Sequence, residues 1–157
     1  MAIAHWVRTM SAGGEDCIFC RIVAGMSPAS VIYRDEHVIA FMDIQPVNPG
    51  QVLVVPLRHA KDLSELDPES CGRMLQVAQR VAGALRKSSI TCDGINLFLA
   101  DGAVAMQEVF HTHLHVIPRF AGDGFGLKYG PGNFLRLPRE QLEHEAALIR
   151  ASMATGA

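Results

Sequence analysis

The chain has no long hydrophobic run and no strong excess of charge of either sign. Its longest apolar stretches, such as Val52 to Val55, have the length of a strand, whereas a membrane-spanning helix needs about 20 apolar residues. The formal net charge is −2, so the sequence provides no electrostatic basis for broad nucleic-acid binding. Residues 1–14 contain no continuous apolar core of the kind found in a secretory signal peptide. We therefore expect a cytoplasmic protein that binds neither membranes nor nucleic acid.

Cysteine is also scarce, and its absence from most of the chain argues against a disulfide-stabilised fold. In an intracellular compartment disulfides are disfavoured, so the few thiols need another interpretation. Cys71 and Cys92 flank a helical pattern and are interpreted as ordinary core or surface thiols. Cys17 and Cys20 stand close together, and they are considered separately below.

The amount and pattern of apolar residues predict one domain. With 157 residues, 49% of them hydrophobic, the chain is large enough to bury a sizeable core. We predict a flexible tail over residues 1–15 and a single domain over residues 16–157. The pattern indicates an α+β fold with an antiparallel β-sheet, a long central helix and a C-terminal helix. The expected helices cover residues 17–24, 68–87 and 139–153, and the expected strands cover residues 30–34, 37–41, 51–56, 95–100 and 109–118.

Three histidines alternate with other residues in the last of these strands. His111, His113 and His115 would project from one face of a strand, because its side-chain period is two. Neighbouring apolar residues such as Val109 and Val116 mark the strand as central, which argues against a chance run of surface histidines. Imidazole is largely neutral at pH 7 and can therefore bind metal, attack phosphorus or carry a proton. A purely metal-binding stripe and a catalytic site both remain open, and we favour the catalytic site.

A second group of residues has the composition of a zinc site. Cys17 and Cys20 form a CxxC motif that opens a predicted helix, although CxxC alone is a weak signal. The βαβ pattern of a thioredoxin does not follow it, which disfavours a redox motif. With His59 and one histidine of the triad, the motif would supply a Cys2His2 set for tetrahedral zinc. Two buried thiols without a metal are the alternative.

Together these residues resemble the histidine triad (HIT) superfamily of nucleotide-binding hydrolases and transferases, in particular its CxxC-bearing, HINT-like branch. The resemblance covers the chain from about Cys17 to Arg119, and the order and spacing of its parts make it specific. The polar Thr112 is a departure within the histidine run. The matching segments are residues 17–22, 40–46 and 52–56, His59, Gln107 and residues 111–116.

The resemblance implies a homodimer in which two sheets join and the long helices pack near the two-fold axis. It implies one structural Zn²⁺ per chain, bound by Cys17, Cys20, His59 and His111. It also implies an active site in which His113 is the nucleophile and His111, His115 and Gln107 complete the catalytic set. Asp43 matches the acceptor of the ribose hydroxyls, and Gln107 and His115 match groups that contact the α-phosphate. The residues that match the apolar slot for a purine base are Ile18, Phe19, Ile22, Phe41 and Ile44.

The implied function is hydrolysis at the α-phosphate of adenosine-type nucleotides, with phosphoramidates preferred. A neutral imidazole would attack phosphorus and form a nucleotidyl-histidine intermediate, which water then releases. The non-attacking nitrogen must keep its proton, so a neighbouring acceptor has to fix the tautomer. Diadenosine-polyphosphate hydrolysis, nucleotidyl transfer and non-catalytic nucleotide binding by an interaction module are the alternatives.

Three further positions depart from the pattern of the family. Gln51 stands where many members have a fourth histidine, so a proton relay there is in doubt, whereas hydrogen bonding can survive. Ala100 replaces a common asparagine and removes one phosphate contact. Glu108 places a carboxylate where a hydroxyl is usual near the leaving group. We also expect the glycine-rich residues 121–133 to form a mobile loop near the site.

Overall fold

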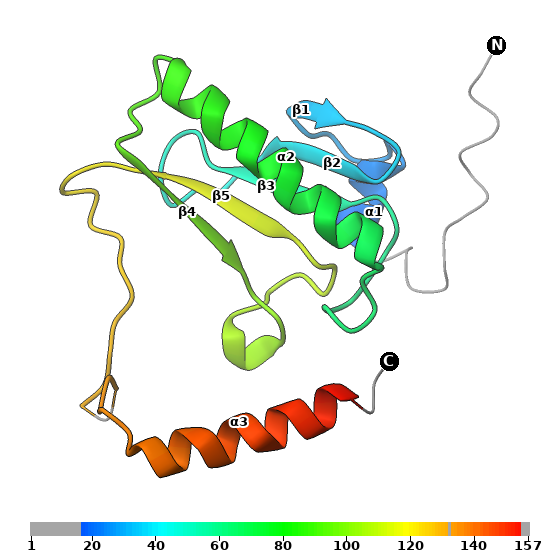
Figure 1. Cartoon of the computed structure of the whole chain (residues 1–157). Coiled ribbons are helices and arrows are strands. Elements are labelled where there is room, and N and C mark those ends of the chain that lie inside the picture. The colour runs from blue at the N-terminus through cyan, green and yellow to red at the C-terminus, as the bar shows by residue number, and fades with distance from the viewer. Residues whose placement is uncertain (1–16, 132, 155–157) are drawn as a thin grey trace. The chain divides into compact units, whose positions relative to one another are not determined.

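The computed structural model describes residues 17–131 and 133–154, so the predicted flexible tail lies outside the described residues. The chain divides into two compact units after Gly124. The first unit contains a five-stranded sheet with two helices and a 3-10 turn, and the second contains one helix (Figure 1). The elements are α1 (Ile18–Val23), β1 (Val31–Arg34), β2 (Val38–Met42), β3 (Val52–Pro56), α2 (Pro68–Lys87), β4 (Gly94–Leu99), η2 (Ala103–Ala105), β5 (Leu114–Arg119) and α3 (Arg139–Ala154).

The sheet has the strand order β1-β2-β3-β5-β4, and all neighbouring strands are antiparallel. The expected α+β class with an antiparallel sheet is thereby confirmed. Strand β5 is internal, since it pairs with β3 on one side and β4 on the other. His115 lies opposite Leu53 of β3 and Phe98 of β4.

The histidine strand is shorter than predicted. Strand β5 begins at Leu114, so His111 and His113 precede it instead of lying within it. Leu114 is the last residue of the ladder, opposite Val54 of β3 and Leu99, where β4 ends, and Thr112 N donates instead to Ala60 O over 2.7 Å in the loop after β3. The backbone therefore leaves the β-ladder between His113 and Leu114.

The two faces of the sheet carry separate clusters of apolar side chains. One cluster joins Val38, Ala40, Val54 and Val116 to the apolar side of α2, which crosses the sheet in Figure 1. The other cluster contains Phe19 of α1 and the side chains that alternate with the first set: Ile39, Phe41, Leu53 and Val55. Strands β2 and β3 are almost completely buried because both faces are covered.

Helix α2 has the bounds that the sequence predicts. Asp67 caps it by accepting a hydrogen bond from Ser70 N at 2.8 Å, and Pro68 occupies the first turn, where a missing N–H removes no helical bond. Met74, Val77 and Leu85 point into the core.

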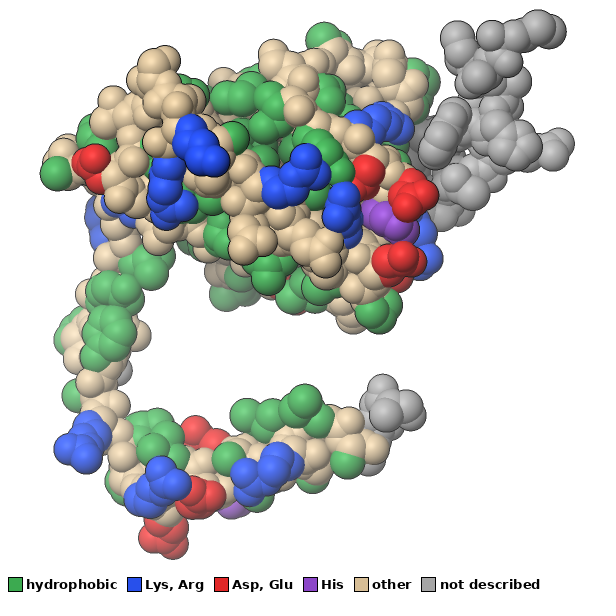
Figure 2. Space-filling model, turned by 45° about the horizontal axis from the view of Figure 1, so that its top comes forward, with side chains coloured by type: hydrophobic (Ala, Val, Ile, Leu, Met, Phe, Trp, Pro, Cys, Tyr) green, Lys and Arg blue, Asp and Glu red, His purple; other side chains and the backbone are tan. Residues whose placement is uncertain are grey.

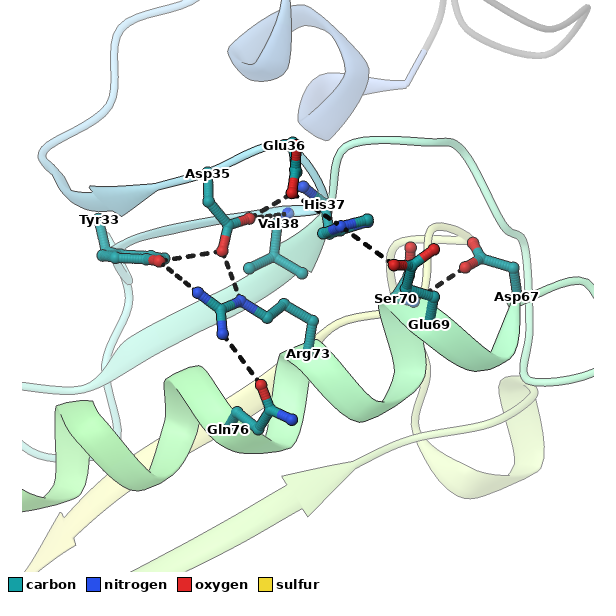
Figure 3. Close-up of polar contacts among 10 residues, drawn as sticks. All are labelled: Tyr33, Asp35, Glu36, His37, Val38, Asp67, Glu69, Ser70, Arg73 and Gln76. Carbon is teal, nitrogen blue, oxygen red and sulfur yellow. Dashed lines mark hydrogen bonds and ion pairs between the residues drawn. The ribbon is translucent and has the colours of Figure 1, made fainter.

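A polar cluster ties α2 to the β1–β2 hairpin (Figure 3). The Asp35 carboxylate accepts hydrogen bonds from His37 N and Val38 N at 2.9 Å and from Arg73 Nε at 2.6 Å. Tyr33 Oη donates to Asp35 over 2.9 Å and accepts from Arg73 Nη2 at 2.8 Å. Burial raises the pKa of Asp35, but the bonds from Val38 and Arg73 outweigh it and hold this pKa well below its usual range. The cluster is a closed ion-paired network.

The surface of the first unit is mixed in character. On the face drawn in Figure 2, basic, acidic and apolar side chains are intermingled. Among the described residues, no helix is both long enough and apolar enough to cross a membrane.

Candidate functional site

The three histidines converge although two of them lie outside the strand. The backbone stays extended enough that the rings of His113 and His115 are 4.9 Å apart, centre to centre. Phe19 contacts His113 edge-on, with ring centres 5.1 Å apart. His111 is fully buried, His113 is 6% exposed, and the side chain of His115 is 20% exposed. The opposite side of the run, with Thr112 and Leu114, is buried in the protein.

His113 has a defined tautomer. Its Nδ1 lies 2.7 Å from the carbonyl oxygen of His111, and a carbonyl can only accept a hydrogen bond. Nδ1 therefore carries the proton, and the lone pair is on Nε2. Burial lowers the pKa of His113, and the charges of Asp43 and Glu108 act against that shift. The arrangement presents a neutral imidazole whose free nitrogen can attack an electrophile.

His115 faces an amide and a carboxylate. Its Nδ1 lies 3.0 Å from Gln51 Nε2 and 3.8 Å from Asp43 Oδ2. Burial lowers the pKa of His115 to about 4; His113 acts in the same direction and Asp43 opposes it. His115 is therefore neutral at pH 7.

Asp43 lies at the end of β2 and receives two hydrogen bonds. Gln51 Nε2 donates to Oδ2 over 2.6 Å, and Gln45 N donates to Oδ1 over 2.9 Å. The carboxylate is thus held beside the histidines by the chain that leaves β2 and returns in β3. Its side chain is 14% exposed, which leaves part of it open to a ligand.

The apolar residues predicted for a base slot fall into two groups. Phe19 and Phe41 are buried and in edge-to-face contact, with ring centres 5.6 Å apart, and Ile22 packs against their cluster. Ile18 is 44% exposed and Ile44 is 93% exposed. The structure therefore brings three of the five together in the core and leaves Ile18 and Ile44 at the surface.

Gln107 is buried, and its amide is fully engaged with its own loop and with the loop after β3. Its Oε1 accepts from Gly102 N at 2.8 Å, while Nε2 donates to Lys61 O at 2.7 Å and to Val109 O at 3.2 Å. An amide has two N–H donors, and both are used here. A contact between Nε2 and a phosphate oxygen would require one of these bonds to break.

A cavity of about 460 Å³ opens beside the histidine loop. Glu108 contributes to its wall, whereas His113, His115 and Asp43 are not among the residues that line it. Lys61 and Phe110 also line it, with Lys61 Nζ 5.7 Å from the centre of the Phe110 ring. Neither residue was predicted from the sequence to belong to a site. The available signal was their position in the sequence, close to His59 and Glu108. The remaining lining residues are Cys17, Ile18, His59 and Val109.

The predicted Cys2His2 set is brought together. The ligand atoms of Cys17, Cys20, His59 and His111 all lie within 4.8 Å of one another, so they could hold a metal ion. Cys17 is the N-cap of α1 and Cys20 lies in its first turn, so both thiols point to one side. His59 comes from the loop after β3, and His111 from the loop before β5.

His111 is oriented as a ligand. Its Nε2 is 2.9 Å from the carbonyl oxygen of Pro56, so Nε2 carries the proton and the lone pair of Nδ1 faces the thiols. Nδ1 lies 3.4 Å from Cys17 Sγ and 3.5 Å from Cys20 Sγ. Burial, followed by the effect of Cys17, raises the pKa of Cys20 to about 12. A cation at the centre would reverse this preference, because metals bind the thiolate.

Fold and site together define an α+β protein with a triad of alternating histidines, two of them buried, beside a Cys2His2 cluster. The HIT domain family model matches residues 24–122, and the chain belongs to the HIT family.

Similar proteins come from several bacteria and a plant. An uncharacterised HIT-like protein of Borreliella burgdorferi is 45% identical over 129 residues, which cover 82% of this chain and 91% of that protein. The adenylylsulfatase HINT3 of Arabidopsis thaliana is 36% identical over 105 residues, which cover 67% of this chain and 53% of that protein.

Solved structures have the same fold. A HIT family protein of Bacillus anthracis has a TM-score of 0.81 at 37% identity, covering 88% of this chain and 98% of that chain. A zinc-bound histidine triad family protein of Mycobacterium smegmatis has a TM-score of 0.70 at 40% identity, covering 90% and 99%.

Proposed function

We propose that this protein hydrolyses adenosine-type nucleotides at the α-phosphate, phosphoramidates among them, through a nucleotidyl-histidine intermediate. The observation that carries the proposal is the bond between His113 Nδ1–H and the carbonyl of His111, because it leaves Nε2 with a lone pair in a neutral, buried ring. His115 stands beside it as a second neutral imidazole.

The proposed reaction has two steps. Nε2 of His113 forms a bond to phosphorus while the bond from phosphorus to the leaving group breaks, and the leaving group takes up a proton from solvent. Water then attacks the same phosphorus and gives up a proton to solvent, the P–N bond breaks, and the nucleotide leaves with the imidazole regenerated. The carbonyl of His111 holds Nδ1–H throughout and stabilises the positive charge that develops on the ring.

Substrate recognition follows from the neighbouring groups. We assign the ribose hydroxyls to the Asp43 carboxylate and the non-bridging phosphate oxygens to His115. The purine would lie against the apolar residues of α1 and β2, with Ile18 and Ile44 able to cover it because both are exposed at that edge. The name of the Arabidopsis relative, an adenylylsulfatase, supports adenylyl sulfate as a further substrate to test.

We further propose that the metal is zinc, one ion per chain, with a structural role. A tetrahedral zinc ion with Zn–S near ~2.3 Å and Zn–N near ~2.0 Å places its ligand atoms about 3.5 Å apart. Three ligand pairs fit this value: Cys17–His111 at 3.4 Å, Cys20–His59 at 3.3 Å and Cys20–His111 at 3.5 Å. The zinc-bound relative from Mycobacterium smegmatis supports the choice of metal. When bound, the ion would fix α1 and both loops around the triad.

We also propose that the protein is a homodimer joined through β4. Within the described residues β4 pairs with β5 alone, and its outer edge is available for a second copy. Leu97 of this strand is 44% exposed and Phe98 is only partly buried, which is unfavourable for an isolated edge strand. Light scattering coupled to size-exclusion chromatography should give twice the chain mass, and Leu97→Lys should shift it toward the monomer.

The function is tested by turnover of adenosine 5′-phosphoramidate, adenylyl sulfate and a diadenosine polyphosphate side by side. We expect His113→Ala to lower kcat on the order of 10⁴-fold, while His144→Ala, a histidine of α3, serves as the matched control. Rapid quench of the wild type with labelled substrate should trap label on the protein. AMP binding without turnover of any of the three would replace the enzyme with a nucleotide-binding module.

A further inference from the structure

Gln51 occupies the position where the sequence departs from the fourth histidine of the family. It is the residue before β3, its side chain is only 2% exposed, and its amide contacts three different groups. Nε2 lies 2.6 Å from Asp43 Oδ2 and 3.0 Å from His115 Nδ1, and Oε1 lies 2.8 Å from Val47 N. The amide thus stands between the carboxylate and the imidazole.

The orientation of this amide is determined by the backbone. Val47 N–H can only donate, so the atom facing it must be the amide oxygen. The nitrogen must then face Asp43 and His115, and its two hydrogens match these two acceptors. The opposite orientation would place the amide oxygen against the carboxylate and leave Val47 N–H facing an NH2 group.

The orientation of the amide decides the tautomer of His115. An amide nitrogen has no available lone pair, so it can only donate to His115 Nδ1, which must be unprotonated. The carboxylate does not compete for a proton on Nδ1, because Asp43 Oδ2 is 3.8 Å away, beyond hydrogen-bond distance. The proton of the neutral ring is therefore on Nε2.

We infer that Gln51 is a positioning residue that holds His115 as the Nε2–H tautomer, so that His115 acts as a fixed hydrogen-bond donor beside His113. The two rings then have opposite tautomers 4.9 Å apart: His113 presents a lone pair at Nε2, and His115 presents a proton at Nε2. One nitrogen can attack phosphorus while the other donates to a phosphate oxygen. The catalytic part of this inference rests on the proposed function, whereas the tautomer itself does not.

The same amide couples two parts of the substrate site. Asp43, assigned to the ribose, and His115, assigned to the phosphate, are held by the two hydrogens of one nitrogen. A histidine at position 51 could exchange protons with both neighbours, but an amide cannot titrate near neutral pH. The charged or titratable groups that face His115 are Asp43 and His113, and burial keeps His115 neutral.

The first test reads the tautomer directly, without any substrate. Two-bond ¹H–¹⁵N correlation spectra of the purified wild type at pH 7 should show His115 with protonated Nε2 and unprotonated Nδ1. Gln51→Met keeps the length and removes both hydrogens, so His115 should lose this single form and give the mixture of tautomers typical of free imidazole. Gln51→Glu places an acceptor at Nδ1 and should move the proton to that nitrogen. Gln79→Met, at an exposed position of α2, should leave the spectrum unchanged.

The second test uses turnover of adenosine 5′-phosphoramidate. We expect Gln51→Met to lower kcat about 10- to 100-fold, because the donor to the phosphate is no longer held in place. His115 found with protonated Nδ1 in the wild type, or an unchanged tautomer in both Gln51 variants, overturns the inference. If the tautomers respond as expected but the wild type turns over no nucleotide, the proposed function fails and the assignment of Gln51 stands. If Gln51→Met does not fold, the Gln51→Glu spectrum decides alone.

Discussion

Two aspartates flank strand β2, Asp35 in the turn that precedes it and Asp43 directly after it, and the two carboxylates have different partners. Asp35 and Asp43 have similarly accessible side chains, 18% and 14% exposed. Asp35 is bound by a guanidinium, a hydroxyl and two backbone N–H groups. Asp43 is bound by an amide and a backbone N–H, with the nearest cationisable group, His115, neutral and 3.8 Å away. The two carboxylates are buried to a similar degree, so it is their hydrogen-bond partners that distinguish them.

If Asp43 binds the nucleotide as proposed, the residues that flank one strand contribute to stability on one side and to substrate binding on the other. The Asp35 end has its charge balanced within the protein, so little remains for a ligand to satisfy. The Asp43 end keeps a carboxylate, a lone pair on His113 and a proton on His115 without a balancing cation. Such a set is available to a ligand that supplies donors and charge, which is typical of functional sites.

The largest expected effect concerns a third cluster, the Cys2His2 set beside the triad. Cys20→Ser should abolish stoichiometric zinc and lower the free energy of unfolding by several kcal/mol, up to roughly 10, because metal binding is linked to folding. Metal analysis and urea unfolding measure the two effects. Cys71→Ser changes an exposed thiol and should do neither. A Cys20→Ser protein with wild-type stability would mean that the stability of the fold around the histidine triad does not depend on a bound metal.

Substitution of one aspartate should affect stability alone, and substitution of the other should affect nucleotide binding alone. Asp35→Ala should lower the free energy of unfolding by about 2 kcal/mol, since several hydrogen bonds to a charged group are lost, and leave kcat/KM unchanged. Asp43→Asn should change stability little and raise KM for the nucleotide roughly tenfold or more. Urea unfolding and steady-state kinetics on both variants give the answer. The two aspartates do not have different roles if both variants lose activity and stability to the same degree.

Acid should remove the contribution of Asp35 selectively. Its pKa in the folded protein is lower than the unfolded value near ~3.9, so the protonated unfolded chain gains relative stability as the pH falls. The stabilisation is fully present above about pH 5 and is lost as the pH falls toward the folded pKa. The difference in unfolding free energy between wild type and Asp35→Ala should therefore shrink between about pH 5 and pH 2. A difference that stays constant over this range would show that the carboxylate charge is not what stabilises the hairpin.

The smallest expected effect is a gain in stability. Thr112 Oγ1 is buried, and within the described residues it has no hydrogen-bond partner. Thr112→Val keeps the shape and removes the unsatisfied hydroxyl, so it should raise the free energy of unfolding by about 1 kcal/mol. Urea unfolding would measure the gain, and turnover should stay at the wild-type level. Destabilisation would show that the hydroxyl finds a partner, such as water, in solution.

The parts of the fold that depend on local patterns could be predicted from the sequence. The bounds of α2 follow from its apolar spacing and its Asp67-Pro68 start, and β3 follows from its apolar run. The start of β5 could not be predicted, because it depends on where β4 ends and on the bond between Thr112 and Ala60. Composition alone does not reveal such distant pairing.

The partners of some polar residues could also be predicted from the sequence, and those of others could not. The clustering of Cys17, Cys20, His59 and His111 was predictable because their residue types and the family motif limit the choice. The partners of Gln51 and of Gln107 were not, since an amide can bond to many groups and only the fold selects among them. The Asp35–Arg73 pair joins residues 38 positions apart, and nothing in either local sequence indicates the other.

The end of the ladder between His113 and Leu114 has a consequence for motion. Moving the backbone of His115 would disturb its register with Leu53 and Phe98 on both sides, whereas His113 has no strand partner to lose. In an in-line displacement the nucleophile and phosphorus must approach, while the donors to the phosphate oxygens work best if they stay in place. Strand pairing therefore constrains the backbone of His115 more than that of His113, although the two residues are only two positions apart.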